Sequence, residues 1–446
     1  MNISQINRSD IEDRFDPKYI LYLQNIHGFK YEVFPLKKFL IEKPQYGTAE
    51  IGLPRTSTQQ PRYIRITDIN DFGELDDSLG ATAENCSDEY FLYENDLLFA
   101  RSGATVGKTY LHKHLSYPAF FAGYMIRVRL DESTLLPDYL FAYTQTSFYK
   151  NWVDAIQRAA AQPNINAEEY ASLPIPIPPL SVQQTIVDLY TDAQNQRKRK
   201  LEESQKLLES VDDYLLSELG IELPQEDNSL KNRIFISTFH NVTGSRIDPF
   251  ANTPVLEKLR SNLNNSSFVY LKDAVTETKF ITTEISSSDT YIGLENIESN
   301  TGSYIRTDEK ETISSALLFE RGQILFPKLR PYLNKVYLAE FSGLCSTEFH
   351  VFNARNMDSN FLHYCLLSKI TLEQTSNLMT GNTLPRLQSS DIEHILIPNP
   401  PFEKQKEIAE HIREIRNQAK QLKNEADIIL QDAKNQVEKM ILEKEQ

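Results

Sequence analysis

The same segment occurs twice in this chain, first as Leu173-Pro-Ile-Pro-Ile-Pro-Pro-Leu-Ser-Val-Gln183 and again as Ile395-Leu-Ile-Pro-Asn-Pro-Pro-Phe-Glu-Lys-Gln405. Each copy joins a short apolar run to a cluster of prolines, and a long polar stretch follows it. Proline interrupts strand ladders and helix interiors, but it is well accommodated just before a helix begins. Each copy therefore predicts the end of one module and the start of a helix, with Ser181 as an N-cap in the first copy.

Three other pairs of segments repeat in the same order along the chain. They are Arg14-Phe-Asp-Pro17 with Arg246-Ile-Asp-Pro249, Tyr63-Ile-Arg-Ile-Thr-Asp-Ile69 with Tyr291-Ile-Gly-Leu-Glu-Asn-Ile297, and Asn95-Asp-Leu-Leu-Phe99 with Gly322-Gln-Ile-Leu-Phe326. The copies stay about 220 to 230 residues apart, and chance hardly supplies four such pairs in order. The sequence therefore predicts a tandem duplication of a unit of about 220 residues.

Each unit is predicted to contain a mixed α/β module and a long helix. Short β-rich runs in the modules alternate with helical stretches and with Gly, Asn and Asp turns. The expected fold class is α+β, with two mixed α/β domains in tandem that are separated and followed by long helices. The expected boundaries are 1–180 for the first domain, 181–222 for the central helix, 223–243 for a linker, 244–402 for the second domain and 403–446 for the distal helix.

The distal helix carries a heptad pattern. Its apolar side chains recur at alternating steps of four and three residues from Ile408 to Ala433, which is the spacing of a coiled coil. The central helix has a weaker pattern because the basic run Arg197-Lys-Arg-Lys200 interrupts it. Two copies related by a local two-fold axis would bring their helices together antiparallel, as a rod of about 60 Å. The expected interface residues of this coiled coil are Ile186, Tyr190, Leu208, Val211, Leu215, Ile412, Ile415, Leu422 and Ile429.

The composition is that of a globular protein with two or three domains. Of the 446 residues, 40% are hydrophobic and 24% are charged. No stretch approaches the ~18 uncharged apolar residues of a membrane span, and the polar start offers no signal peptide. Three distant cysteines argue against a disulfide scaffold or a zinc ribbon. Together these features favour a reducing cytoplasm as the location.

Positive charge is concentrated in one segment of each copy, although the net charge is −15. Residues 97–130 and 321–339 contain basic side chains and no Asp or Glu. Such local concentration is typical of a surface that neutralises phosphates. The alternative is that basic and acidic strands simply neighbour each other in the sheet. The candidate DNA-binding residues are these basic residues and polar or basic neighbours: Arg65, Arg101, Ser102, Thr105, Lys108, Lys113, Arg127, Arg306, Lys328, Arg330, Asn334 and Lys335.

Two segments resemble catalytic motifs but depart from them. Gly103-Ala-Thr-Val-Gly-Lys-Thr109 has three residues between its glycines, whereas a phosphate-binding loop needs four. Asn399-Pro-Pro-Phe402 matches the tetrapeptide of amino-methyltransferases, but no glycine-rich loop for the methyl donor accompanies it. The histidines form no metalloprotease or hydrolase pattern. We therefore predict no catalytic residues and no metal site in this chain.

The chain resembles the specificity subunits of type I restriction-modification enzymes, the HsdS proteins, over essentially its whole length. The segments that carry the resemblance are 164–184, 383–387 with 403–408, 101–109, and 329–335 with Cys345-Ser-Thr-Glu-Phe349. The resemblance implies two target-recognition domains, each followed by a spacer helix. It further implies a non-catalytic subunit that reads a bipartite, asymmetric sequence in double-stranded DNA, one half-site per domain, while the helices set the gap.

The resemblance also implies partners and cofactors. Two methyltransferase subunits that methylate adenine would dock on this chain, and restriction subunits would complete the enzyme. S-adenosylmethionine, ATP and magnesium would belong to those partners and not to this chain. Two alternatives stay open: a fused restriction-methylation enzyme, which the missing donor-binding motif counts against, and a coiled-coil assembly scaffold without its own DNA readout.

Overall fold

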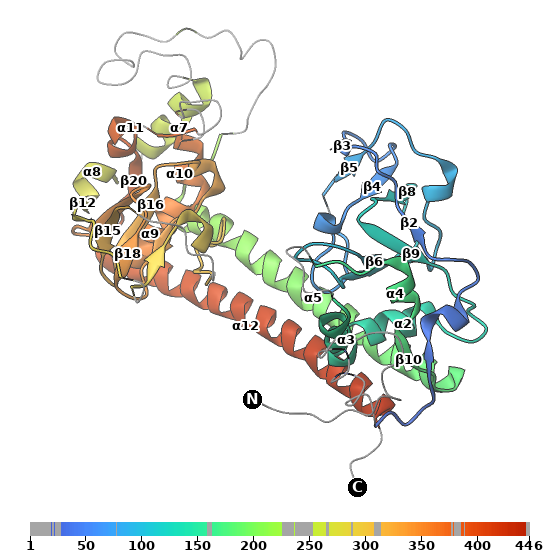
Figure 1. Cartoon of the computed structure of the whole chain (residues 1–446). Helices are drawn as coiled ribbons and strands as arrows, with labels where there is room; N and C mark the ends of the chain where they lie inside the picture. Colours follow the sequence, from blue (N-terminus) through green and yellow to red (C-terminus); the bar gives the residue numbers. More distant parts are fainter. Residues whose placement is uncertain are drawn as a thin grey trace. The chain divides into compact units, whose positions relative to one another are not determined.

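The computed structural model divides the chain into two compact units (Figure 1). Unit 1 comprises Met1–Leu201 and Asn424–Gln446, and unit 2 comprises Glu202–Lys423. The structure describes residues 19, 22, 28–76, 78–157, 163–224, 236, 253–264, 267–286, 289–306, 314–375, 378, 385–387 and 389–442. The repeat segments at Arg14 and Arg246 and nearly all of the expected linker 223–243 lie outside these residues. None of the described helices is long and apolar enough to cross a bilayer.

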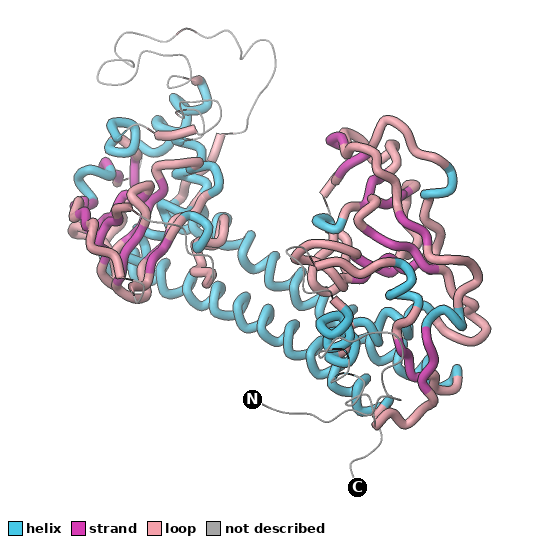
Figure 2. The backbone as a smooth tube through the Cα atoms, in the orientation of Figure 1, coloured by secondary structure: helices cyan, strands magenta, loops and turns pink. Residues whose placement is uncertain are grey.

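Two long helices follow the repeated proline segments. Helix α5 spans Leu180–Leu219 and helix α12 spans Phe402–Ile441, so each begins directly after its prolines and runs without a break (Figure 2). The repeated glutamine of each segment fixes the helix start. The buried Gln183 side chain accepts a hydrogen bond from the Leu136 amide and donates to the carbonyls of Thr134 and Pro178. Gln405 does the same in unit 2 with the Asp358 amide and the Pro400 carbonyl.

The two helices pair antiparallel within each unit. In unit 1, Ile186 and Tyr190 of α5 pack in one core with Leu430 and Val437 of α12. In unit 2, Leu215 of α5 lies in one core with Ile408, Ala409 and Ile412 of α12. Ion pairs follow the same order, from Lys200 with Glu425 at 2.6 Å to Glu218 with Lys404 at 2.6 Å. The predicted antiparallel coiled coil is therefore confirmed.

The heptad pattern predicts the wrong buried positions in the last part of α12. The structure buries Leu430, Val437 and Ile441 there, while the predicted Ile429 is only half-buried and Ile428 is 59% exposed. From Ala426 the buried positions follow steps of 4, 3, 4 and 4 residues. This spacing lies closer to the 3.6-residue period of a straight helix than to the 3.5-residue heptad. The reason is that α12 packs here against the module as well as α5, with Ile441 accepting a hydrogen bond from the Lys30 amide.

The predicted residues of the coiled-coil interface differ in how deeply they are buried. Ile186, Tyr190, Leu215 and Ile412 are at most 2% exposed, whereas Leu208, Val211, Ile415 and Leu422 are half-buried. In the middle of the helices the contact is made by small residues. The buried Ser204 hydroxyl donates to the Ala419 carbonyl oxygen at 2.8 Å, and Ala426 is fully buried. Small side chains at the contact allow the two backbones to approach more closely than a leucine seam would.

The first sheet of unit 1 has the strand order β2-β9-β6-β7, and all neighbours are antiparallel. Its strands are β2 (Gln45–Tyr46), β9 (Met125–Val128), β6 (Leu97–Ala100) and β7 (Thr109–Leu111). Helices α2 (Pro137–Thr144) and α3 (Ser147–Ile156) contribute to the same core, which contains Phe99, Tyr143 and Trp152. Strand β6 is buried at every position, as expected of the continuous apolar run Leu-Leu-Phe-Ala.

The second sheet of unit 1 has the order β3-β5-β4-β8, with β4 and β8 parallel, and a separate pair joins β1 to β10. These strands are β3 (Leu53–Pro54), β5 (Ala81–Thr82), β4 (Arg62–Ile64), β8 (Ala119–Phe121), β1 (Val33–Pro35) and β10 (Pro174–Pro176). Strand β10 is formed by the repeated proline segment. Prolines are tolerated there because the pair has two edge strands and needs few amide donors.

Unit 2 repeats this architecture. Its first sheet has the order β12-β19-β16-β17, its second has β13-β15-β18-β14, and β11 pairs with β20. The strands are β11 (Phe268–Tyr270), β12 (Val275–Thr278), β13 (Ile281–Thr282), β14 (Tyr291–Ile292), β15 (Ala316–Phe319), β16 (Ile324–Pro327), β17 (Tyr337–Leu338), β18 (Gly343–Cys345), β19 (Phe349–Ala354) and β20 (Leu396–Pro398). The described helices of this module are α7 (Pro254–Asn264), α8 (Leu271–Ala274), α9 (Ser359–Leu367), α10 (Lys369–Thr375) and α11 (Ser389–Glu393).

The two modules share their strand register. Leu97 lies opposite Leu111 and Val128 in unit 1, and Ile324 lies opposite Leu338 and Phe352 in unit 2. The predicted tandem duplication is therefore confirmed. In the second sheet, the antiparallel pairing of β15 with β18 has its counterpart in unit 1 in the bridge between Phe91 and Phe120.

A buried histidine makes the stability of unit 1 depend on pH. Burial lowers the pKa of His112 to about 4 against the opposing effect of Asp96, so the folded state holds this ring neutral. The unfolded chain binds the extra proton below its ordinary pKa of about 6.5, so stability is lost as the pH falls from there toward 4.

We expect His112 to remove about 2 kcal/mol from the unfolding free energy of unit 1 between about pH 7 and pH 5. Urea unfolding followed by Trp152 fluorescence measures it, because the only tryptophan of the chain lies in the unit 1 core. The change His112→Gln should remove this part of the pH dependence. An equal pH slope in the wild type and the variant would contradict the assignment.

Candidate functional site

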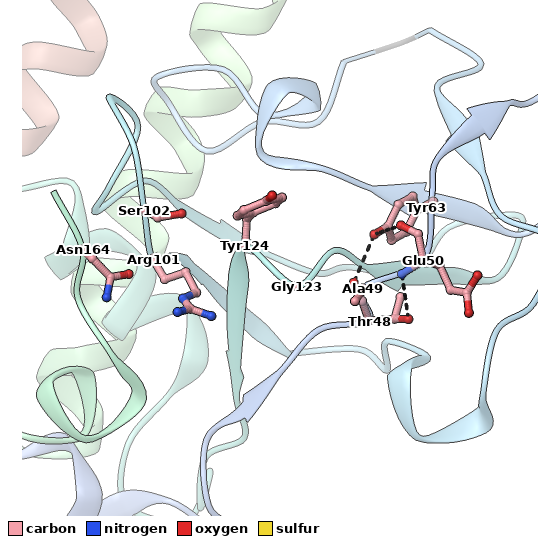
Figure 3. Close-up of a pocket in the computed structure, with 9 residues that line it drawn as sticks. All are labelled: Thr48, Ala49, Glu50, Tyr63, Arg101, Ser102, Gly123, Tyr124 and Asn164. Atoms are coloured by element: carbon pink, nitrogen blue, oxygen red, sulfur yellow. Dashed lines mark hydrogen bonds between the residues drawn. The ribbon is translucent and has the colours of Figure 1, made fainter. Parts of the chain in front are cut away.

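Unit 1 contains an open pocket of about 470 Å³ beside the end of strand β6 (Figure 3). It gathers segments that are far apart in the sequence: the chain after β2, strand β4, the loop after β6, the turn before β9, and the segment before α4 (Ala167–Ala171). The lining residues are Thr48, Ala49, Glu50, Tyr63, Arg101, Ser102, Gly123, Tyr124 and Asn164. Both donors and acceptors of hydrogen bonds therefore face one cavity.

The backbone holds Arg101 in place from two sides. Its amide donates to the Tyr124 carbonyl oxygen at 3.0 Å, and its carbonyl oxygen accepts from the Ile165 amide at 2.8 Å. Ser102 forms a β-bridge with Asn164 in addition. The pocket wall is therefore a short extension of the sheet and not a free loop.

The Arg101 side chain lies over the ring of Tyr46, with the guanidinium carbon 4.7 Å from the ring centroid. Its Nε is buried and has no hydrogen-bond partner among the described residues, and the same holds for Oδ1 of Asn164. Buried polar atoms are nearly always paired, so two unpaired ones in a single pocket make it a candidate binding site.

The opposite wall is held by Tyr63. Its hydroxyl donates to the carbonyl oxygens of Thr48 and Glu50 at 3.1 and 2.9 Å. Gly47 lets this segment pass close to β8, since a Cβ there would lie 2.3 Å from the Ala122 carbonyl oxygen. Between the two walls stands Tyr124, whose side chain is 67% exposed (Figure 3).

Unit 2 has the same backbone arrangement with different side chains. The Lys328 amide donates to the Glu348 carbonyl oxygen at 2.8 Å, and Leu329 forms a β-bridge with Arg386. Lys328, Leu329, Glu348 and Arg386 therefore correspond to Arg101, Ser102, Tyr124 and Asn164. In unit 2 an ion pair of 2.8 Å joins Arg386 to Glu348, and the Lys328 amino group donates to the Thr347 carbonyl oxygen. Burial lowers the pKa of Lys328.

The structure brings only part of the predicted DNA-binding set into the pocket. Arg101 and Ser102 line it, and Thr105 belongs to the same β6–β7 loop. Other basic side chains pair with acidic ones in their own module: Arg65 with Asp68, Lys108 with Asp71 and Lys113 with Asp138. Ion pairs within the module therefore engage these three side chains, although none of the pairs joins two strands of a sheet. Arg306 and Arg330 are exposed, and Arg330 has left-handed backbone angles.

Three predictions of accessible side chains need correction. Arg127 is 3% exposed, and its guanidinium donates to the carbonyls of Glu89 and Phe91 and to the Gln45 side chain. Asn334 is 4% exposed, and its amide donates to the Leu367 carbonyl at 2.7 Å. The Lys335 amino group donates to the Leu294 carbonyl oxygen at 2.8 Å. Arg127 and Asn334 are buried in the fold, and Lys335, which is half-buried, binds a carbonyl oxygen of its own module.

The segments that resemble catalytic motifs have structural roles. Residues 103–109 connect two antiparallel strands, whereas a phosphate-binding loop leads from a strand into a helix. Asn399 accepts a hydrogen bond from Gln405 at the start of α12. In the part of the chain that the structure describes, no cluster of His, Cys, Asp and Glu could hold a metal ion.

Sequence reasoning missed Glu50, Tyr124 and Asn164 as members of the site. The repeat contained a signal for two of them, because Tyr124 and Asn164 fall at the same offset from Glu348 and Arg386 as their surrounding segments do. Positions that differ inside a repeated framework are candidates for specificity, and this comparison would have selected them.

Comparison with known families decides what these modules are. The model of the type I restriction modification DNA specificity domain matches residues 36–209 and 255–429. The chain belongs to this specificity family. Each match covers one mixed module and part of the helix that follows it, so the specificity domain occurs twice.

Individual relatives are more distant. The chain is similar to the EcoDI specificity subunit of Escherichia coli, with 30% identity over 43% of this chain and 39% of that protein. It is also similar to the MjaVIII specificity subunit of Methanocaldococcus jannaschii, with 21% identity over 74% of both. The chain thus spans about two fifths of the EcoDI protein in that match.

Solved structures of related proteins align along most of the chain. An S subunit of a type I restriction-modification system from M. genitalium aligns with 12% identity and a TM-score of 0.42, over 94% of this chain and 98% of that one. A chain from a study of complex assembly in the type I R-M system aligns with 14% identity and a TM-score of 0.43, over 93% and 97%.

Proposed function

We propose that this chain is the DNA-reading specificity subunit of a type I restriction-modification system. It reads a bipartite, asymmetric target in double-stranded DNA, one half-site with each specificity domain, and the paired helices set the gap. The observation that carries the proposal is the pair of specificity domains with one backbone framework and different side chains at the equivalent positions 101, 102, 124, 164 and 328, 329, 348, 386. Two copies that read the same bases would have no reason to differ there.

The physics of recognition favours two linked readers. One domain with a few base contacts discriminates by only about 1–3 kcal/mol for each mismatched base pair. Joining two domains on one frame makes the second contact intramolecular, so the two specificities multiply. A gap measured against ~10–10.5 base pairs per turn then becomes part of the target.

Catalysis belongs to partners in this proposal. Two methyltransferase subunits dock on the chain and methylate adenine, and restriction subunits complete the nuclease. S-adenosylmethionine, ATP and magnesium serve those subunits. The structural role of the motif-like segments supports this division.

The proposal is tested against the scaffold alternative by measuring DNA binding of the purified complex with its methyltransferase. We expect the affinity to fall at least about tenfold between about 50 and 200 mM salt, since contacts to phosphates release counterions. Methyltransferase alone is the control. Binding of the complex that equals this control at every salt concentration would favour a scaffold without DNA readout.

A further inference from the structure

We propose that Arg101 and Asn164 of the unit 1 pocket read one G·C base pair of the first half-site from the major groove. This inference rests on the proposed function and names the chemistry of that site. The guanidinium of Arg101 donates to O6 and N7 of the guanine. The Oδ1 of Asn164 takes the amino group of the paired cytosine.

The hydrogen-bonding groups of the pocket match this base pair. In the major groove a G·C pair presents two acceptors on guanine and one amino donor on cytosine. The pocket offers Arg101, a donor with a buried unpaired Nε, next to Asn164, an acceptor with a buried unpaired Oδ1.

A phosphate fits the pocket less well than a base edge. The Oδ1 of Asn164 would face the oxygens of a phosphate bound to Arg101 and repel them. The mixture of donors and acceptors therefore selects a base edge over the DNA backbone.

The arginine is held in position before any ligand arrives. Hydrogen bonds to Tyr124 and Ile165 fix its backbone, and the Tyr46 ring supports its guanidinium from one side. Arginine reads guanine with two parallel hydrogen bonds, and lysine cannot reproduce this planar geometry. A fixed side chain loses little conformational freedom on binding, which strengthens discrimination.

The equivalent positions in unit 2 carry a different set of groups. Lys328 stands at the position of Arg101, and Arg386 stands at the position of Asn164. Arg386 forms an ion pair with Glu348. The donor and acceptor positions of the two pockets are therefore not the same. The half-site read by unit 2 should differ from that of unit 1, as an asymmetric target requires.

The test uses the complex with its methyltransferase and duplexes that carry the mapped target with one base pair replaced at a time. For each replaced pair, the discrimination ratio is the affinity for the intact target divided by the affinity for the replaced one. Arg101→Gln and Arg101→Lys should both lower this ratio about 10- to 100-fold, toward one, at a single G·C pair. The other pairs of both half-sites should keep their ratios.

Lys43→Gln is the matched control for charge, because Lys43 is an exposed side chain of the same unit outside the pocket and the variant also loses one positive charge. A lower affinity at all sequences with every ratio intact, in Arg101→Gln but not in Arg101→Lys, would identify a phosphate contact and overturn the inference. The inference would also be overturned if the wild-type complex reads a two-part target but no G·C pair in it loses its discrimination in the Arg101 variants. That result would leave the proposed function intact. If the wild-type complex shows no sequence preference, the proposed function itself fails, and this inference fails with it.

Folding of the Arg101 variants is checked by their Trp152 fluorescence and by assembly with the methyltransferase. A ratio that relaxes at one base pair requires a folded complex that still reads all the others, so misfolding cannot imitate the expected result.

Discussion

A chain with four residues inserted into each long helix is expected to direct methylation to the same two half-sites across a longer gap. The insertions are placed between Leu201 and Glu202 in α5 and between Lys423 and Asn424 in α12, where the chain passes from one compact unit to the other. Each unit keeps its own helix contacts, because these lie within the unit. The base contacts of both domains should therefore stay unchanged.

The size of the effect follows from helix geometry. Four helical residues add about 6 Å, which corresponds to about two base-pair steps of B-DNA at ~3.4 Å each. We expect the gap to grow by about one to two base pairs, and methylation at the original spacing to be lost. Maps of methylated adenines in cells that express the insertion variant with the methyltransferase measure both.

Four substitutions to alanine at exposed positions of the same helices, without insertion, serve as the control for helix composition. They should leave the gap as it is. Altered bases in either half-site at an unaltered gap would contradict the role of the helices as a spacer.

Truncating Leu430 to alanine is expected to lower the unfolding free energy of unit 1 by about 2–5 kcal/mol. The Leu430 side chain is 1% exposed and lies in the core that contains Ile186, Tyr190 and Trp152. Removing it costs the transfer free energy of the lost atoms and leaves a cavity between the helices and the module. Urea unfolding of the full chain, followed by Trp152 fluorescence, reports on this core directly.

Ile428→Ala is the matched control for the Leu430 variant. Ile428 lies two residues away on the same helix and is 59% exposed, so its truncation should cost less than about 0.5 kcal/mol. Equal losses for the two variants would show that the buried face of α12 is assigned wrongly. The heptad pattern continued from Ile408 would instead have assigned the burial to Ile429.

The sequence was sufficient for the architecture because the architecture is repeated. The proline segments at Leu173 and Ile395 predicted where both long helices begin, and the structure starts them at Leu180 and Phe402. The heptad pattern predicted a coiled coil, and the duplication predicted its antiparallel direction. The heptad pattern predicted the wrong buried residues after Ala426. There the module packs against a second side of α12, which a pattern along one helix does not reveal.

The site was predicted less completely for a different physical reason. Arg101 was found because it stands out in a basic segment, but Glu50, Tyr124 and Asn164 reach it only through strand pairing between distant residues. Arg127 shows the opposite error, since a basic residue in a strand can point inward and satisfy the carbonyls of Glu89 and Phe91. Charge along the chain does not indicate which face of a strand carries it.

The central claim is that this chain gives a methyltransferase its sequence specificity. The most direct measurement is a map of methylated adenines in cells that express the chain with its companion methyltransferase, compared with cells that express the methyltransferase alone. The account predicts a new two-part motif with a fixed gap that appears only when the chain is present. No new methylation, despite a stable complex of the two proteins, would contradict the claim and favour an assembly scaffold.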